Sequence, residues 1–415
     1  MKVIAEKSRR YGLVYRTRGF GQRMVALLAP DAMGFMLSDQ TKLFSSADGW
    51  GYYLDRLFPR GLMLLDFDEH RLHRRALSVA FKSGPLKSYL AALNLGIAER
   101  LAEWRQGPAE FLFYPAIKQL TLDLAATAFL GSALGPEVAA IKRAFIDMVA
   151  AAVAVIRRPL PGTRMRRGVR GRAFIVDYFS RQTPLRRERG GEDLFSQLCR
   201  ATHEDGSLMT VQEIADHMSF LMMAAHDTLT SSLSAFVYFL SLHQEWQEKL
   251  RAEIAALGFA EGEPLPFEGL DRLPLTEMAF KEAMRLIPPV ISLPRRAQRE
   301  FEFGGHRIPA GANTFCSILF VHHMPEVWPE PERFDPTRFS PENERRRHRF
   351  AYVPFGGGAH MCLGLNFSHM QAKCFAYHLL RASRVAMAPG YRPTWQMMPI
   401  PKPRDGLTVS LAPRP

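Results

Sequence analysis

The stretch FAYVPFGGGAHMCLG, residues 350–364, sets three consecutive glycines and a histidine in front of a single cysteine. Apolar spacing in the following LGLNFSHMQAKCFAYHLLRA, residues 363–382, predicts a helix. Glycines let the backbone adopt positive φ and approach a flat group closely, and a helix N-terminus stabilises a negative charge beside it. The stretch therefore predicts a metal-binding thiolate at Cys362 beneath a planar cofactor; an inert buried thiol is the alternative.

The composition of the chain limits its size class, its number of domains and its cellular compartment. The chain has 415 residues, of which 47% are hydrophobic, enough for a large core. No shift in composition marks a linker, so we expect one domain over residues 1–415. The four cysteines form no CxxC pair, which favours a reducing compartment, the cytoplasm by default. The N-terminus shows no signal peptide and no membrane-spanning run.

The charge balance narrows the partners. Lys and Arg number 54 against 41 Asp and Glu, a formal net charge of +13. Such a surface suits acidic proteins or anionic lipid. We expect no nucleic-acid partner, because no zinc-finger spacing, RNA-recognition motif or heptad-backed basic region occurs.

The chain reads mainly as helix, with strands towards its two ends, so we expect a mainly α fold with small β-sheets. Glycine and proline punctuation predicts strands within 12–30 and 301–320. Apolar spacing and flanking breakers predict further helices at 69–80, 87–106, 116–130, 136–156, 163–181, 211–242, 244–257 and 274–286.

The longest predicted helix contains FLMMAAHDTLTSS at 220–232, which places an acid and a hydroxyl in an apolar segment. One interpretation is structural: Thr228 back-bonds to the carbonyl of Ala224, and Asp227 reaches solvent or a basic partner. The other is functional. Ala224 and Ala225 then open space beside a cofactor, Asp227 and Thr228 handle protons there, and the helix ladder opens locally.

Two further motifs follow along the chain. KEAMR, residues 281–285, places Glu282 and Arg285 at i, i+3 on one helix face, and FDPTRF, residues 334–339, adds Arg338. A single such pair contributes only a few tenths of a kcal/mol on a solvated helix. The order of the motifs is more informative than any one of them.

In this order AAHDT, EAMR, FDPTRF and FGGGAHMCLG resemble the motifs of the cytochrome P450 haem-thiolate monooxygenases, and the resemblance extends over residues 11–411. It implies the P450 fold, a triangular prism of helices enclosing haem b. It also implies Cys362 as the axial ligand of the iron, with Phe355, Gly356 and Gly364 around it. A thiolate pushes electron density onto iron, and N–H groups of the loop moderate its charge.

The resemblance further assigns partners to the two haem propionates. DEHRLHRRALSVAF, residues 68–81, is similar to the family's C helix and supplies His70 and Arg74. Arg295 and His360 are the other two donors. Arg296, which is adjacent to Arg295, is the alternative for the propionate-binding arginine. Two ionised carboxylates require such cationic or donor groups.

The implied reaction is reductive activation of O2 and hydroxylation of a C–H bond. Asp227 and Thr228 deliver protons beside the haem, where Ala224 and Ala225 leave room. Glu282, Arg285 and Arg338 form a supporting charge network behind the haem. Electrons come from NAD(P)H through a separate partner, because no flavin or iron–sulfur domain is fused to the chain.

An acidic ferredoxin or flavodoxin with its reductase is the expected donor, and we expect a monomer. The basic residues assigned to its docking face are Arg71, Arg75, Lys373, Arg345, Arg346, Arg347 and Arg349. A merely solvated run of charges is the alternative. A haem-thiolate isomerase or dehydratase and a non-catalytic haem sensor are the rival functions, and the Asp227–Thr228 pair argues against both.

The resemblance assigns the substrate pocket to apolar segments, which favour a lipophilic steroid, terpenoid or fatty acid. Its predicted residues are Tyr52, Leu64, Met222, Ala224, Val290, Ile291 and Met397. The chain resembles the microsomal-like branch of the family, so we expect an N-terminal leader that is short or missing.

The connection IRRPLPGTRMRRGVRGR, residues 156–172, places apolar Leu160 between arginines. By resemblance it joins the two helices that roof the distal pocket. We expect weak peripheral contact with an anionic membrane, at the inner membrane face, through this connection. A solvated loop is the alternative.

Overall fold

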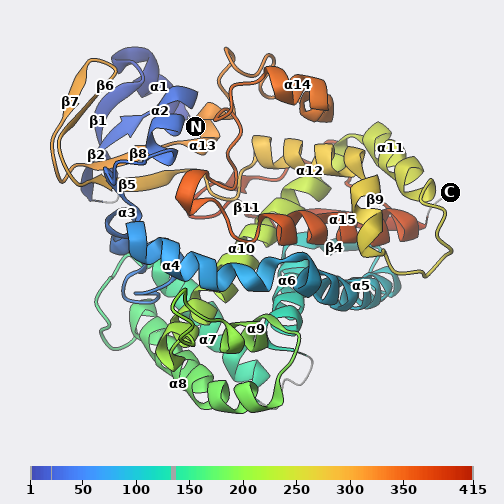
Figure 1. The fold of residues 1–415 in the computed structure, drawn as a ribbon. Helices are drawn as coiled ribbons and strands as arrows, with labels where there is room; N and C mark the ends of the chain where they lie inside the picture. Colours follow the sequence, from blue (N-terminus) through green and yellow to red (C-terminus); the bar gives the residue numbers. More distant parts are fainter. Residues whose placement is uncertain (1, 20, 132–136, 414–415) are drawn as a thin grey trace.

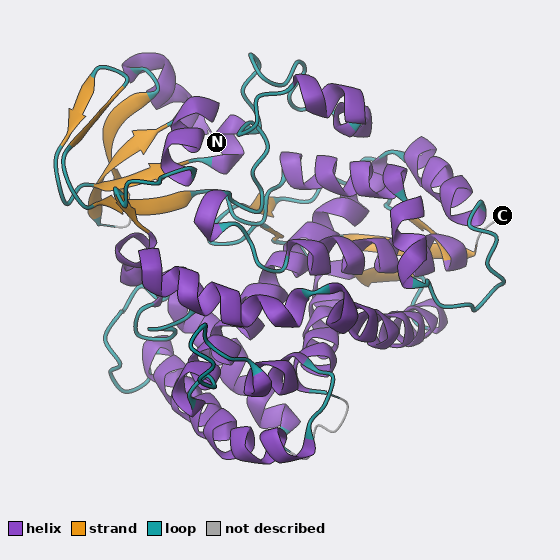
Figure 2. Ribbon diagram, viewed as in Figure 1, coloured by secondary structure: helices purple, strands orange, loops and turns teal. Residues whose placement is uncertain are grey.

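The computed structural model describes residues 2–19, 21–131 and 137–413 and shows a mainly helical molecule with its largest sheet at one end (Figures 1 and 2). The α-helices are α1 (Lys2–Tyr11), α2 (Pro30–Leu37), α3 (Ser46–Leu54), α4 (Phe67–Ser78), α5 (Ser83–Gln106), α6 (Phe113–Leu130), α7 (Val138–Ala152), α8 (Arg164–Arg189), α9 (Leu194–Arg200), α10 (Val211–Leu242), α11 (Gln244–Ala255), α12 (Pro274–Leu286), α13 (Ile318–Val321), α14 (Pro341–Arg346) and α15 (Leu365–Ala382). The expectation of a mainly α fold with small sheets is confirmed.

Residues from both ends of the chain build the largest sheet. Its strands are ordered β1 (Val14–Gly19), β2 (Gln22–Leu27), β8 (Asn313–Cys316), β5 (Leu293–Ala297) and β3 (Phe44–Ser45). The smaller sheets pair β6 (Phe301–Phe303) with β7 (His306–Ile308), β10 (Trp395–Gln396) with β11 (Lys402–Pro403), and β12 (Thr408–Pro413) with β4 (Glu110–Leu112) and β9 (Ser383–Ala386). The strands expected within 12–30 and 301–320 are present.

The central helix α10 begins and ends at the predicted residues, and its start carries a local signal. Thr210 accepts a hydrogen bond from the Glu213 N–H, and the Glu213 side chain accepts one in return from the Thr210 N–H. The predicted 163–181 helix is longer than expected: α8 runs on to Arg189, through Pro184. Residues 164–172 of the basic connection are therefore helix, not loop.

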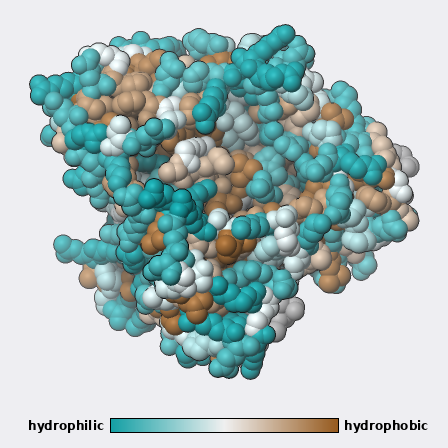
Figure 3. Space-filling view, in the orientation of Figure 1, coloured by the Kyte–Doolittle hydropathy of each residue, from teal (hydrophilic) through white to brown (hydrophobic). Residues whose placement is uncertain are grey.

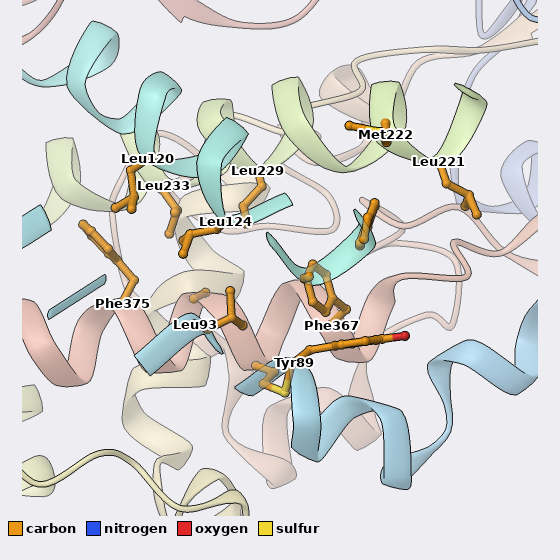
Figure 4. Close-up of a cluster of buried hydrophobic side chains, with 14 of the residues drawn as sticks. Tyr89, Leu93, Leu120, Leu124, Leu221, Met222, Leu229, Leu233, Phe367 and Phe375 are labelled. Atoms are coloured by element: carbon orange, nitrogen blue, oxygen red, sulfur yellow. The ribbon is translucent and has the colours of Figure 1, made fainter. Parts of the chain in front are cut away.

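The main core packs around α10. Leu221, Leu229 and Leu233 of α10 meet leucines of α5 and α6 and phenylalanines of α15 (Figure 4). Leu93, Phe129, Phe236 and Phe375 are at most 1% exposed. Burying each such side chain stabilises the fold by about 1.5–3 kcal/mol, so α10 is held rigidly on several sides.

The surface differs in character from this core. On the face drawn in Figure 3, hydrophilic residues predominate and apolar ones appear in small groups. Among the described residues, no helix combines the length and apolarity that a membrane crossing requires.

Candidate active site

The cysteine loop, residues 350–364, lies between α14 and α15. Cys362 donates its backbone N–H to the Phe355 carbonyl, at 2.8 Å, which closes the loop. Gly356 and Gly358 adopt φ of +71° and +61°. A Cβ on Gly358 would lie 1.8 Å from the Leu37 carbonyl oxygen, so only glycine lets the loop pack on α2.

The Cys362 thiol is accessible, unlike the other three cysteines, which are buried. Its surroundings are nevertheless desolvating, and this raises its pKa. Two neighbours act in the opposite direction: the Gly364 backbone N–H, which hydrogen-bonds the sulfur, and the Arg74 guanidinium. These two groups are the ones that would stabilise a thiolate once a metal replaces the proton.

Four donor groups from distant segments converge near this thiol. The His70 and His360 rings lie 3.9 Å apart, and Arg74 and Arg295 both act electrostatically on each of them. Burial lowers the pKa of His70 to about 4 and of His360 to about 2, so both rings are neutral at pH 7. Sequence distances of up to 290 residues separate these groups, so only tertiary folding brings them together.

This cluster has cations without matching anions. Within the described residues, neither Arg74 nor Arg295 has a carboxylate within 4 Å, and the Arg295 guanidinium donates only to the carbonyl of Pro294. Asp66 approaches His360, at 3.9 Å, but it accepts hydrogen bonds from Ser45 and from the backbone beside it. Arg295 is buried, with Asp66 acting on it only through space, and Arg74 is half-buried; guanidinium groups withdrawn from water in this way favour an anionic ligand.

One stretch of α10 is less completely buried than its flanks. Met223, Ala224, Ala225 and Thr228 are partly exposed, although they pack in the main core and the flanking residues of α10 are buried. Ala224 and Thr228, at i and i+4, share one face of the helix, and Met223 and Ala225 lie on either side of it. This face is where the sequence places room for a cofactor.

These features fit a haem. The accessible thiol suits iron ligation, the unpaired cations suit two propionates, and small residues on α10 leave space for a flat ring. The predicted cofactor-binding residues of the loop, α4, β5 and α10 therefore have the donor chemistry that the group requires. Their roles stay predictions.

The proposed proton-handling pair shows both contacts of its structural interpretation. Thr228 Oγ1 donates to the Ala224 carbonyl at 2.7 Å, and Asp227 Oδ1 lies 3.1 Å from Lys118 Nζ. The expected local opening of the helix ladder is wrong, because α10 is helical without interruption. Thr228 bonds back to the Ala224 carbonyl within a regular helix, so its hydroxyl does not open the ladder.

The Glu282–Arg285 pair is fully buried, and its contacts are those of a structural network. Arg285 donates to both Glu282 oxygens, at 2.7 and 2.9 Å, and to the carbonyls of His322 and Arg333. The Arg338 Nε lies 3.4 Å from Glu282. Burial raises the pKa of Glu282, whereas Arg285 lowers it.

His322 connects this network to the cysteine loop, and sequence reasoning missed it. Its Nδ1 lies 3.2 Å from the Arg285 carbonyl, and its Nε2 accepts the Val353 N–H at 3.2 Å. The ring is buried and stacks on Tyr352. No local motif marks this histidine, because its partners are distant in the sequence.

The predicted substrate-pocket residues lie in different surroundings. Ala224, Val290, Ile291 and Met397 are partly exposed. Leu64 and Met222 are buried, with only 7% and 3% of their surface exposed. Met222 packs with the core residues of Figure 4.

Tyr52, by contrast, is 44% exposed, and the Arg157 guanidinium lies 5.3 Å from its ring centroid. A role for each of these residues in substrate binding stays a prediction.

A cavity of about 780 Å³ lies on another side of the cysteine loop. Phe355 and Met361 of the loop line it together with Phe81, Phe267, Lys281 and Lys373. None of its lining residues comes from α10 or from the predicted substrate pocket. It is therefore separate from the partly exposed stretch of α10.

The comparisons with known proteins agree with this geometry. The chain is 39% identical to a protein named putative cytochrome P450 136 of Mycobacterium tuberculosis, over 97% of this chain and 83% of that protein. It is 28% identical to the taxane 10-beta-hydroxylase of Taxus cuspidata, over 100% of this chain and 84% of that protein. The solved structure of cyanobacterial CYP120A1 with bound retinoic acid superposes with a TM-score of 0.89, at 28% identity, over 99% and 94% of the two chains. The family model for cytochrome P450 matches residues 1–409, and the chain therefore belongs to the cytochrome P450 family.

Proposed function

We propose that this P450 monooxygenase hydroxylates a C–H bond of a lipophilic isoprenoid, with electrons supplied by a separate protein. The observation that carries the proposal is the convergence of the exposed Cys362 with buried Arg295 and half-buried Arg74, neither of which has a carboxylate within 4 Å among the described residues. Two similar proteins support the substrate class. One is named for hydroxylation of a taxane, and the other was solved with retinoic acid; both ligands are isoprenoids.

The chain's own residues would act as follows. Cys362 would hold the iron, and His70, Arg74, Arg295 and His360 would bind the carboxylates of the cofactor. Haem, when bound, supplies the reductive activation of O2. The hydroxyl of Thr228, which donates to the Ala224 carbonyl in this structure, would hold a water beside the cofactor, to which Asp227 would pass protons.

A substrate screen tests this proposal. The haem-loaded protein is titrated with a retinoid, a cyclic diterpene, a sterol and a long-chain fatty acid, and the spin-state change of the haem is followed. We expect the isoprenoids to give the tightest response, followed by a hydroxylated product with O2, NAD(P)H and a reductase system. Spin-state change only with the fatty acid would reject the isoprenoid class, and turnover without O2 would reject hydroxylation.

Fewer of the basic residues assigned to the docking face are exposed and unpaired than the sequence suggests. Arg71 pairs with Asp68, Arg75 with Glu204 and Arg346 with Glu342. Lys373 is buried and paired with Glu277 at 2.7 Å, so its place on an exposed face is wrong. Arg347 also turns inward, with its guanidinium 4.2 Å from the Trp328 ring centroid.

The exposed pairs on α4 contribute little individually, so Arg71 and Arg75 can exchange their carboxylates for those of an acidic ferredoxin or flavodoxin. The formal charge of +13 favours the same type of partner.

Membrane contact is proposed through the α7–α8 connection. Val155, Ile156 and Leu160 are 97%, 54% and 52% exposed, and Arg158, Arg164, Arg167 and Arg170 around them are exposed as well. Arg157 does not belong to this surface. It donates to the carbonyls of Tyr53 and Ala152 and thereby ties the connection to α3.

Replacing Arg158, Arg164 and Arg167 by Gln is expected to release the protein from anionic vesicles. Each arginine near such a surface contributes about 1 kcal/mol, so their joint loss should lower binding on the order of a hundredfold. Co-sedimentation with phosphatidylserine vesicles at low and high salt measures this. The triple Gln variant of Arg9, Arg10 and Arg345 is the charge-matched control. Equal loss in both variants would mean that net charge, not this connection, directs binding.

A further inference from the structure

The inward face of α4 is polar over its first turns. Its buried residues are His70, His73, Ala76 and Leu77, and the spacing of three between the first of them places these side chains on one face of the helix. An amphipathic helix ordinarily carries apolar side chains on its buried face. The seating of this half of α4 therefore depends on the contacts of two histidines.

His73 joins α4 to the central helix α10 through a hydrogen bond. Its Nδ1 lies 2.9 Å from Nε2 of His217. Its Nε2 lies 3.6 Å from Oε1 of Glu213, which is one turn earlier on α10. His73 and His217 are only 3% and 1% exposed, so little water competes for the hydrogen bond between the two rings.

The direction of this hydrogen bond follows from the surroundings of both rings. The Glu213 carboxylate attracts a hydrogen, so the neutral His73 ring carries its hydrogen on Nε2, and the lone pair on Nδ1 accepts from His217 Nε2. His217 Nδ1 is then a lone pair, and this atom is buried without a hydrogen-bond partner among the described residues. The opposite direction would leave an unpaired N–H there, which is the rarer case in folded proteins.

Glu213 is the fixed end of this arrangement. Its Oε2 accepts hydrogen bonds from the backbone N–H and the hydroxyl of Thr210, at 2.7 and 2.9 Å, and lies 3.3 Å from His203 Nε2. These contacts belong to the capping box that begins α10. Glu213, His73 and His217 thus form one series, which we call the Glu213–His73–His217 series.

Burial keeps both histidines of the series neutral at pH 7. It is the largest cause that lowers the pKa of His73, and it lowers the pKa of His217 to about 3. Asp216, beside His217, pairs instead with Arg172 of α8 at 3.1 Å. A second hydrogen on His73 would meet the N–H of His217, so protonation either breaks the hydrogen bond or forces an unpaired N–H onto His217 Nδ1.

Titratable groups from four segments act on His73. After burial, Glu213 of α10 raises its pKa, Arg60 of the loop before α4 and His203 of residues 201–209 lower it, and Glu69 of α4 raises it. Arg60 and Glu69 pair with each other, and their side chains are 46% and 49% exposed, so solvent screens both. The Glu213 side chain is 21% exposed, and protons from solvent reach the series at this end.

The position of α4 matters for the cofactor, because His70 and Arg74 flank His73 on this helix. Both are predicted donors to the haem carboxylates. Burial, Arg74 and Arg295 lower the pKa of His70, and His73 adds to their effect. Contacts that seat α4 on α10 therefore set where the two donors lie, and a charge on His73 acts on one of them.

We propose that His217 is a positioning residue for the cofactor: through His73 it holds α4 against α10, places His70 and Arg74 for the haem carboxylates, and releases this hold in acid. The proposal depends on the haem site and not on the substrate. None of its tests requires turnover, so an absence of hydroxylation would reject the proposed function and leave this proposal to be decided separately.

Haem retention at neutral pH is the first test. The haem-loaded protein is mixed with excess apomyoglobin, and the transfer of haem is followed by absorbance. His217→Leu removes the donor to His73 and should release haem on the order of tenfold faster. His217→Gln keeps an amide N–H for the same acceptor and should retain haem as the parent does. Release from His217→Leu at the parent rate, or no rescue by His217→Gln, would overturn the proposal.

Thr230→Val is the matched control for this test. Thr230 also lies on α10 and makes a buried hydrogen bond to another helix, at 2.7 Å to Thr121 of α6. The variant should lower the free energy of unfolding in urea about as much as His217→Leu does and should leave haem release unchanged. Faster release from both variants, in proportion to their lost stability, would assign His217 a purely structural role.

The pH profile of haem release is the second test. Because the pKa of His73 is held below its ordinary value of 6.5, the hold should weaken as the pH falls below that value. Glu213→Gln keeps a residue suited to the capping box but removes an anion, so the midpoint should move to lower pH. Arg60→Gln removes a cation, so the midpoint should move to higher pH. A midpoint that neither variant moves would show that acid acts elsewhere and would overturn the release.

Discussion

Cys362→Ser is expected to abolish the thiolate-type spectrum of the reduced, CO-bound protein, which is the largest single-residue effect that we predict. Serine keeps the size and the loop but is a poor ligand for haem iron, so the strong axial bond is lost. The Gly364 N–H and Arg74, which stabilise negative charge at this position, then have no thiolate to act on. The readout is the position of the Soret band together with haem content per chain.

Cys316→Ala is the matched control for this experiment. Cys316 is 0% exposed, burial raises its pKa to about 12, and its thiol contacts the Ala32 carbonyl at 3.7 Å. It should lose a little stability and keep the full thiolate spectrum. An unaltered spectrum in Cys362→Ser, or a lost one in Cys316→Ala, would show that Cys362 is not the ligand.

Arg285→Ala is expected to destabilise the protein by about 3–5 kcal/mol, because it leaves the Glu282 carboxylate buried without its bidentate partner. It also removes donors from the His322 and Arg333 carbonyls and disturbs the link from His322 to the cysteine loop. Urea unfolding of the haem-loaded protein gives the free energy, and the yield of folded, haem-containing protein gives a second readout.

Arg346→Ala provides the matched control. Arg346 pairs with Glu342 at 2.8 Å, and both side chains are more than 60% exposed. Solvent screens such a pair, so the loss should stay within about 1 kcal/mol. Comparable destabilisation by the two variants would refute the idea that burial makes the Glu282–Arg285 pair structural. Normal stability of Arg285→Ala with impaired turnover would assign it a catalytic role instead.

The helices were predictable where apolar spacing and end signals coincide. Helix α10 begins and ends as expected at 211 and 242, and α12 at 274 and 286, because a capping box or a first-turn proline marks each start. Short helices were missed: α2, α3 and α9 have at most nine residues, too few for apolar spacing to identify a helix. Tertiary contacts stabilise them, which local patterns do not record.

The strand pairing in the five-stranded sheet could likewise not be predicted from local sequence patterns. The sequence indicates strands at both ends of the chain but not that β2 pairs with β8, whose residues follow it by nearly 290 positions. Pairing between distant strands depends on how the intervening helices pack, and no period in either strand specifies its partner.

The sequence by itself determined the family, the cysteine and the order of the motifs, because each of these depends on residues close together in the chain. Only the tertiary structure decided that Arg74 and Arg295 lack anions, that Lys373 is buried, that Arg157 ties the α7–α8 connection to α3, and that His226 and Lys118 meet at Asp227. Charge and solvation depend on distance in space, and the residues that set them here come from α4, α6, α10, α15, β5 and the α7–α8 connection.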